Sequence, residues 1–236
     1  MRLSFVNARI VDPASGHDGP GALVVEDGRV AGLLDGDPPA GGTVVDCAGK
    51  VLAPGLVDMR VFVGEPGARH RESLRTAGRA AAAGGVTTIV TQADTQPPID
   101  DPALVQFVRS RAEAAAVPVR VRVMAALTKG LAGREMTEQQ FLLDAGAVAL
   151  SDADRPLADT GLMRTLMTYS TSTGALIVHH PQDAALSSKG SATSGEFATR
   201  LGLPSVPANS PEVAEPLADS AASCGWCTIS APVEVE

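Results

Sequence analysis

Hydrophobic and polar residues alternate along the first fifty positions, and this alternation predicts short β-strands. Leu3–Val6 and Thr43–Cys47 alternate in this way, and Ala22–Val25 leads into Asp27–Gly28, a pair typical of tight hairpin turns. Gly and Pro are frequent in Asp35–Gly42, which we expect to form a loop. Because no helical period interrupts the pattern, we predict that residues 1–50 form a small all-β domain.

The pattern changes at Val51, where apolar runs begin to alternate with stretches of helical period. The predicted strands are Val51–Val57, Val86–Gln92, Val119–Met124, Ala147–Ser151, Ala175–His180 and Trp226–Ser230. The predicted helices are Arg71–Ala83, Pro102–Ala116, Thr137–Ala145, Gly161–Ser172, Gly195–Leu201 and Ser210–Ala222. Strands that alternate with helices favour a parallel sheet, because parallel neighbours need a crossover connection.

Polar residues follow most of the predicted strands, which favours a TIM-like (β/α) barrel over a doubly wound sheet. A Gly-x-Gly-x-x-Gly turn is missing after the first predicted strand, so the sequence does not favour a dinucleotide-binding sheet. We therefore predict an α/β fold in which residues 51–236 form the barrel and residues 1–50 precede it.

The barrel is predicted to be incomplete, since the pattern supplies roughly six strands and a whole barrel takes about 250 residues. Three explanations stay open: the chain is a fragment, the barrel is open, or a partner covers its edge. An uncovered edge of a parallel sheet pairs readily with other chains. We therefore expect self-association of this chain.

Charge and composition exclude several classes of function. The chain has a formal charge of −8, from 27 acidic and 19 basic residues, and no Lys/Arg cluster that would favour a nucleic-acid partner. No apolar run approaches the roughly 18 residues that a membrane span needs, so no membrane partner is expected. Three cysteines are too few for a disulfide framework, which predicts a cytoplasmic protein.

The first predicted barrel strand carries the polar residues that decide the chemistry. Asp58, Arg60 and Phe62 lie two positions apart and therefore share one face of that strand. Gly64 and Gly67 then end the strand. Active sites of barrel enzymes lie at the carboxyl ends of the strands, so this stretch is the first candidate site.

Several blocks of sequence resemble, in the same order, the dihydroorotases of the amidohydrolase superfamily. The blocks are Pro54–Asp58 with Glu65–Gly67, Ala80–Val90, Thr95–Pro102, Ala126–Gly130, Ala145–Asp152 and Gly195–Pro204. The resemblance implies an amidohydrolase-type barrel with a small flanking β domain, and a link to pyrimidine biosynthesis.

The resemblance also implies a metal centre, usually zinc. Zinc lowers the pKa of a bound water and polarises the carbonyl of the amide that is opened or closed. The ligands implied by the family are an Asp-x-His-x-His at the first strand, a bridging acid or carbamylated lysine at the fourth, and histidines at the fifth and sixth. A carboxylate base follows at the eighth strand.

This chain departs from the family pattern at the site itself. Arg60 and Phe62 occupy the two histidine positions of the first strand, and neither side chain has a lone pair for a metal. Gly64 replaces the arginine that binds the substrate carboxylate, and Asp94 replaces an asparagine that binds the substrate. We find no histidine for the sixth strand and no segment for the eighth.

Two residues are vestigial candidates for metal ligands. His179 occupies the fifth-strand ligand position that the resemblance implies, and Asp152 lies in the fourth-strand motif Ser151–Asp154. Two ligands fall short of the three protein ligands that a catalytic zinc requires. Adjacent strand residues point to opposite faces, so His180 cannot join His179 in one site without local distortion. The sequence therefore predicts no catalytic residue, and no cofactor is expected.

Two functions of different classes are compatible with these observations. The first is a pseudoenzyme, a catalytically silent homologue that acts as a structural partner of aspartate transcarbamoylase. Within the family, some bacteria pair that enzyme with an inactive dihydroorotase-like subunit. The alternative is a metal-dependent cyclic-amide hydrolase, dihydroorotase or hydantoinase-like, that binds zinc through ligands from elsewhere.

Overall fold

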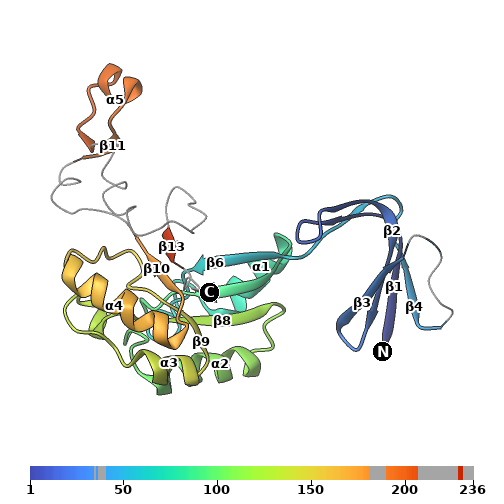
Figure 1. The fold of residues 1–236 in the computed structure, drawn as a ribbon, viewed down its shortest axis with the longest axis horizontal. Coiled ribbons are helices and arrows are strands. Elements are labelled where there is room, and N and C mark those ends of the chain that lie inside the picture. Colours follow the sequence, from blue (N-terminus) through green and yellow to red (C-terminus); the bar gives the residue numbers. More distant parts are fainter. Residues whose placement is uncertain (35, 37–40, 181–189, 207–227, 231–236) are drawn as a thin grey trace. The chain divides into compact units, whose positions relative to one another are not determined.

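The computed structural model describes residues 1–34, 36, 41–180, 190–206 and 228–230. The chain divides into two compact units, residues 1–56 and 57–236, whose elements Figure 1 traces from blue to red. The sequence pattern places this division after residue 50. Of the helices that the structure describes, none has the length and apolar character needed to cross a bilayer.

The first unit is a single five-stranded sheet. Its strands are β1 (Arg2–Asp12), β2 (His17–Glu26), β3 (Arg29–Leu34), β4 (Thr43–Asp46) and β5 (Val51–Leu52). The order is β3-β2-β1-β4, with β5 also paired to β1, and β4 and β5 run parallel to β1. The predicted hairpin turn is present: Asp27 and Gly28 both have positive φ, 48° and 79°, as a type I′ turn requires.

The predicted strand Val51–Val57 is wrong, because two separate strands occupy this stretch. Val51–Leu52 pairs with β1 in the first unit, and a new strand, β6 (Leu56–Val61), begins after Ala53–Gly55. Pro54 has no N–H to donate to a sheet, so it separates the two strands. The stretch is not buried either, since Leu56 and Val57 are 61% and 58% exposed.

The second unit contains a curled sheet that forms half of a barrel. Its strands are β6, β7 (Val86–Thr91), β8 (Arg120–Ala125), β9 (Ala147–Leu150), β10 (Ile177–His179) and β13 (Thr228–Ser230), in the order β13-β10-β9-β8-β7-β6. Strands β7 to β10 pair in parallel, as predicted. The predicted sixth strand is present as β13, but it runs antiparallel to β10 and therefore does not continue the barrel.

The helices lie close to their predicted positions. They are α1 (Leu74–Ala83), α2 (Pro102–Ala114), α3 (Gln139–Asp144), α4 (Thr160–Thr173) and α5 (Glu196–Arg200), together with a short 3₁₀ helix, η1 (Lys129–Leu131), and a two-strand pair, β11 (Ala192–Thr193) with β12 (Ser205–Val206). Helix α1 begins three residues later than predicted because Ser73 caps it by accepting the Thr76 N–H. The predicted helix Ser210–Ala222 lies outside the described residues.

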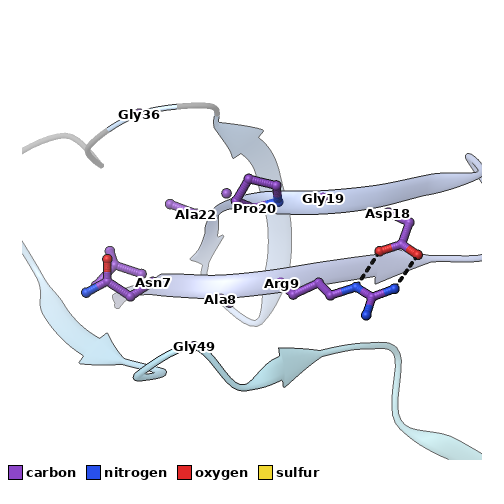
Figure 2. A pocket seen from close by; sticks show the side chains of 11 residues that line it. Asn7, Ala8, Arg9, Asp18, Gly19, Pro20, Ala22, Gly36 and Gly49 are labelled. Atoms are coloured by element: carbon purple, nitrogen blue, oxygen red, sulfur yellow. Dashed lines mark hydrogen bonds and ion pairs between the residues drawn. The ribbon is translucent and has the colours of Figure 1, made fainter.

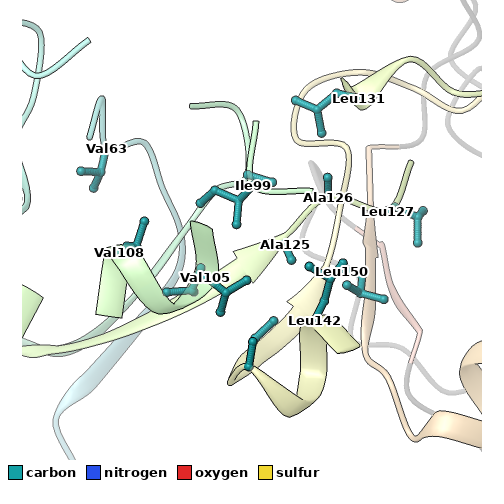
Figure 3. Packing of buried hydrophobic residues seen from close by; sticks show 14 of the residues in the cluster. Val63, Ile99, Val105, Val108, Ala125, Ala126, Leu127, Leu131, Leu142 and Leu150 are labelled. Carbon is teal, nitrogen blue, oxygen red and sulfur yellow. The ribbon is translucent and has the colours of Figure 1, made fainter. Parts of the chain in front are cut away.

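The main core lies between the sheet and the helices α1 to α4. Val123 and Ala125 of β8 face this layer, whereas Met124, between them, joins a smaller cluster on the opposite, inner face. Figure 3 shows Val105 and Val108 of α2 and Leu142 of α3 among the residues of the main core. Strand alternation therefore fixes which side chains can line the interior of the half-barrel.

We predict that Leu142→Ala destabilises the protein by about 2–5 kcal/mol, because it removes a fully buried side chain and leaves a cavity. Urea unfolding followed by circular dichroism measures this change. The matched control is Phe141→Ala on the same helix, where the side chain is 61% exposed. We expect that control to change the free energy of unfolding by less than about 0.5 kcal/mol. Equal effects of the two substitutions would contradict the described packing of α3.

Candidate functional site

The candidate site is the region at the carboxyl ends of β6 to β10, which we call the mouth. It consists of the last part of β6 and the loop that follows it (residues 58–73), the loops after β7 (92–101), β8 (126–138) and β9 (151–159), and residues 179–180 at the end of β10. In barrels this end of the strands carries the active site.

Arg60 of β6 lies on the inner face of the half-barrel. Val61 and Val63 pack toward the helices, so alternation turns Arg60 and Phe62 to the other side. The Arg60 guanidinium forms an ion pair with the carboxylate of Asp154, in the loop after β9. The Arg60 side chain is 28% exposed and that of Asp154 is 73% exposed. The first-strand residue thus bonds to the loop of the fourth strand of the half-barrel.

Phe62 and Gly64 both form contacts with residues of the loop after β6. The guanidinium of Arg71 lies 4.5 Å from the centre of the Phe62 ring, a cation–π contact. The Gly64 N–H donates to the carbonyl of Glu72 at 3.0 Å. A Cβ at Gly64 would lie 2.2 Å from the carbonyl oxygen of Ala68. The loop therefore has no room for any side chain where the resemblance implies an arginine.

Glu65 is a buried carboxylate that our sequence reasoning did not single out. It is 7% exposed and accepts hydrogen bonds from the Leu74 N–H at 3.1 Å and from Arg111 Nε at 2.9 Å. Burial raises the pKa of Glu65, but the hydrogen bonds from Arg111 and Leu74 and the charge of Arg69 outweigh burial and lower it overall. Glu65 therefore holds the loop after β6 against α1 and α2.

Asp152 anchors a loop in this structure. Its Oδ1 accepts the N–H groups of Leu127 at 3.0 Å and Thr128 at 2.8 Å, and its Oδ2 accepts the Thr128 hydroxyl. Burial raises the pKa of Asp152, and these hydrogen bonds oppose that effect. Both oxygens therefore bond to the loop after β8.

His179 ends β10 in a largely buried position. Burial, followed by the charge of His180, lowers the pKa of His179 to about 4, so its imidazole is neutral at physiological pH. Ile177 packs on the helix side and Val178 on the inner side. Alternation therefore assigns His179 to the helix side and His180 to the inner side. Within the described residues, no group of three His, Cys, Asp or Glu side chains could hold a metal.

Other polar residues of the mouth form contacts within their own loops. Lys129 pairs with Glu135 in its own loop, and the Thr95 hydroxyl donates to the Pro97 carbonyl at 2.7 Å. Asp94, at the position where the resemblance implies an asparagine, has a buried Oδ1 with no hydrogen-bond partner in the described part of the chain. A carboxylate in that place would repel an anionic substrate.

A separate cavity of about 810 Å³ lies in the first unit, between β1, β2, Gly36 and Gly49. Figure 2 shows that its charged side chains, Arg9 and Asp18, point at each other, and two hydrogen bonds of 2.7 Å join them. The Asn7 amide donates to Asp46 at 3.0 Å. Because these groups already bond within the protein, the cavity offers no evident chemistry.

Comparison with known proteins gives consistent matches. The family described as Dihydro-orotase-like matches residues 49–231. The chain is 36% identical over 213 residues to a dihydroorotase of Thermoanaerobacter sp. (strain X514), covering 90% of this chain and 49% of that one. It is 36% identical over 208 residues to the dihydroorotase of Geobacter sulfurreducens, covering 88% and 49%. The chain thus spans about half the length of the curated relatives it matches.

Solved structures agree on the fold. The L-hydantoinase (dihydropyrimidinase) from Arthrobacter aurescens aligns with a TM-score of 0.68 and 23% identity, over 78% of this chain and 41% of that chain. A D-hydantoinase aligns with a TM-score of 0.59 and 18% identity, over 79% and 41%. Identities this low establish the barrel fold and nothing about the reaction.

We predict that Glu65→Gln lowers the free energy of unfolding at pH 7 by about 2 kcal/mol, since it weakens hydrogen bonds to a charged group. The folded-state pKa of Glu65 lies below its ordinary value of 4.5. Its contribution is therefore complete above pH 4.5 and is lost as the pH falls through the folded-state pKa. Urea unfolding between pH 3 and 7 measures this dependence.

The control for Glu65→Gln is Glu113→Gln, which changes an exposed carboxylate near Arg111 on α2. We expect the Glu65 variant to lose part of the wild-type decline in stability below pH 4.5, and the Glu113 variant to keep it. Identical profiles for wild type and the Glu65 variant would contradict the described role of Glu65.

Proposed function

The chain belongs to the dihydroorotase-like family of amidohydrolases, and we propose that it is a catalytically silent member that serves as a structural partner of aspartate transcarbamoylase. The observation that supports silence most directly is the ion pair of Arg60 with Asp154 at the first-strand ligand position. With that partner the protein would act in pyrimidine biosynthesis, in the cytoplasm.

The described residues do not fit the zinc centre that the family implies. Arg60 is permanently protonated and Phe62 has no lone pair, so neither can bind a metal. Asp152 directs both oxygens to Leu127 and Thr128. His179 alone is too few, since a catalytic zinc takes three protein ligands.

The substrate side of the mouth is altered as well. A side chain at Gly64 would collide with the Ala68 carbonyl, so the loop excludes the arginine that the family uses for a substrate carboxylate. Asp94 would add a negative charge beside an anionic substrate. Metal ligands and substrate ligands serve different steps, and their joint loss supports a scaffold without the reaction.

The alternative is a metal-dependent cyclic-amide hydrolase. The observation that favours it is the imidazole of His179 at the end of β10, at the fifth-strand ligand position that the resemblance implies; burial lowers its pKa to about 4 and keeps it neutral. Since alternation turns His179 to the helix side, the alternative also requires a local rearrangement at the end of β10. This reading needs further ligands from outside the described residues or from another chain.

We predict that the protein purified with zinc present holds far less than one zinc per chain and hydrolyses dihydroorotate no faster than buffer. Elemental analysis and a hydrolysis assay measure these quantities. His179→Ala should change neither result, because His179 has no role in turnover if the protein is catalytically silent. Stoichiometric zinc, together with turnover that disappears in His179→Ala, would overturn the proposal that the protein is catalytically silent and would support a hydrolase.

We also predict that the protein co-purifies with aspartate transcarbamoylase at micromolar concentrations, and that alone it self-associates. Size-exclusion chromatography with light scattering measures both. A protein of unrelated fold but equal charge is the control, because it separates specific pairing from weak electrostatic association. Failure to associate with the transcarbamoylase would count against the partner, and a monodisperse monomer would contradict the self-association.

A further inference from the structure

Neighbouring loops of the mouth are bonded to one another in series, beginning with those after β6 and β7. The Gln96 N–H donates to the Pro66 carbonyl at 3.3 Å. Gly67 has φ +97°, and a Cβ there would lie 2.6 Å from the Gln96 carbonyl oxygen. The two backbones therefore approach so closely that only glycine fits between them.

The series continues from the loop after β7 to the loop after β8. The Ala126 N–H donates to the Ile99 carbonyl at 2.7 Å, and the Gly130 N–H donates to the Asp100 carboxylate at 2.8 Å. The loops after β8 and β9 are joined in turn by the carboxylate of Asp152, described above. Arg155 strengthens that junction by donating to the Leu131 carbonyl at 3.0 Å.

The Arg60–Asp154 ion pair connects the last loop of this series back to β6. We infer that this ion pair is a clamp that closes the ring formed by the loops after β6, β7, β8 and β9, with Arg60 at a position that the resemblance assigns to a metal ligand. A metal bound by the first and fourth strands would cross-link the same two elements. The likeness to a metal cross-link rests on the proposed function. That the ion pair closes the ring of loops rests only on the contacts described above.

Only one partner of this pair is exposed, which distinguishes it from the fully exposed surface ion pairs that contribute little. The Arg60 side chain is 28% exposed, so most of it is covered by protein. No other ion pair of Arg60 is found among the described residues. Asp154 itself is 73% exposed, so solvent screens part of the attraction, and removing Asp154 leaves a largely covered cation without its ion-pair partner.

Hydrogen exchange on the full chain, with Arg60→Met, Asp154→Asn and the double variant, tests the clamp. Arg60→Met keeps an unbranched apolar stem and removes the charge. We expect amides of residues 59–63 and 152–157 to exchange about fivefold to tenfold faster in either single variant. The double variant should match a single variant, because both substitutions remove the same interaction.

The matched control is the Lys129–Glu135 pair, which lies in the same mouth but within one loop. Lys129→Met and Glu135→Gln should leave exchange at residues 59–63 and 152–157 unchanged. The charge swap Arg60→Asp with Asp154→Arg should restore part of the protection. Circular dichroism verifies folding, and Asp154→Asn, at an exposed side chain, keeps the test available if Arg60→Met does not fold.

Unchanged exchange at residues 59–63 and 152–157, or additive effects in the double variant, would overturn the clamp. Such a result would not affect the proposal that the protein lacks catalytic activity, because zinc content and turnover test that proposal. Conversely, a zinc-loaded and active protein would contradict the proposed lack of activity, even if the exchange results supported a contact between Arg60 and Asp154.

Discussion

The positive charge of Arg60 is the constraint on which the mouth depends. No physiological pH removes that charge, so a largely covered guanidinium must have a carboxylate nearby. Asp154 supplies it, and this draws the loop after β9 toward β6. The same charge opposes a metal ion, because two unit charges 4 Å apart repel by about 4 kcal/mol at an effective dielectric of 20, and a divalent ion doubles this. In the proposed silent protein, Arg60 would therefore both stand at a ligand position and disfavour a metal ion beside it.

The backbone makes this state hard to reverse by single substitutions. Gly64 lies against the Ala68 carbonyl and Gly67 against Gln96, so the path of the loop after β6 is set by close backbone contacts. Restoring histidines at residues 60 and 62 would leave that path unchanged. The substrate arginine would still have no room at Gly64. The departure from the family pattern therefore involves loop geometry as well as the identity of the residues at the ligand positions.

The sequence predicts what depends on local pattern and fails where distant residues decide. Periodicity located β7, β8, α2 and α4 to within a few residues, and alternation placed Arg60 and Phe62 on one face. Pro54 is a local signal for the split between β5 and β6, and the predicted strand Val51–Val57 ran across it. The antiparallel direction of β13 depends on its neighbour β10, which the local pattern does not encode. Asp154 as the partner of Arg60 is nearly a hundred residues away in sequence, and Glu65 gave no signal beyond a carboxylate before Pro-Gly.

The positions at which the chain departs from the family pattern differ in whether the new residue has a partner within the protein. Arg60 has Asp154, Phe62 has Arg71, and Gly64 has the backbone of Glu72. Random loss of a binding site would leave buried polar groups without partners, at a cost of about 1–3 kcal/mol each. Among these positions only Asp94 retains a buried oxygen without a partner in the described residues. Arg60, the replacement that brings a charge, therefore has a partner in this structure, which agrees with a mouth that stays ordered without a metal.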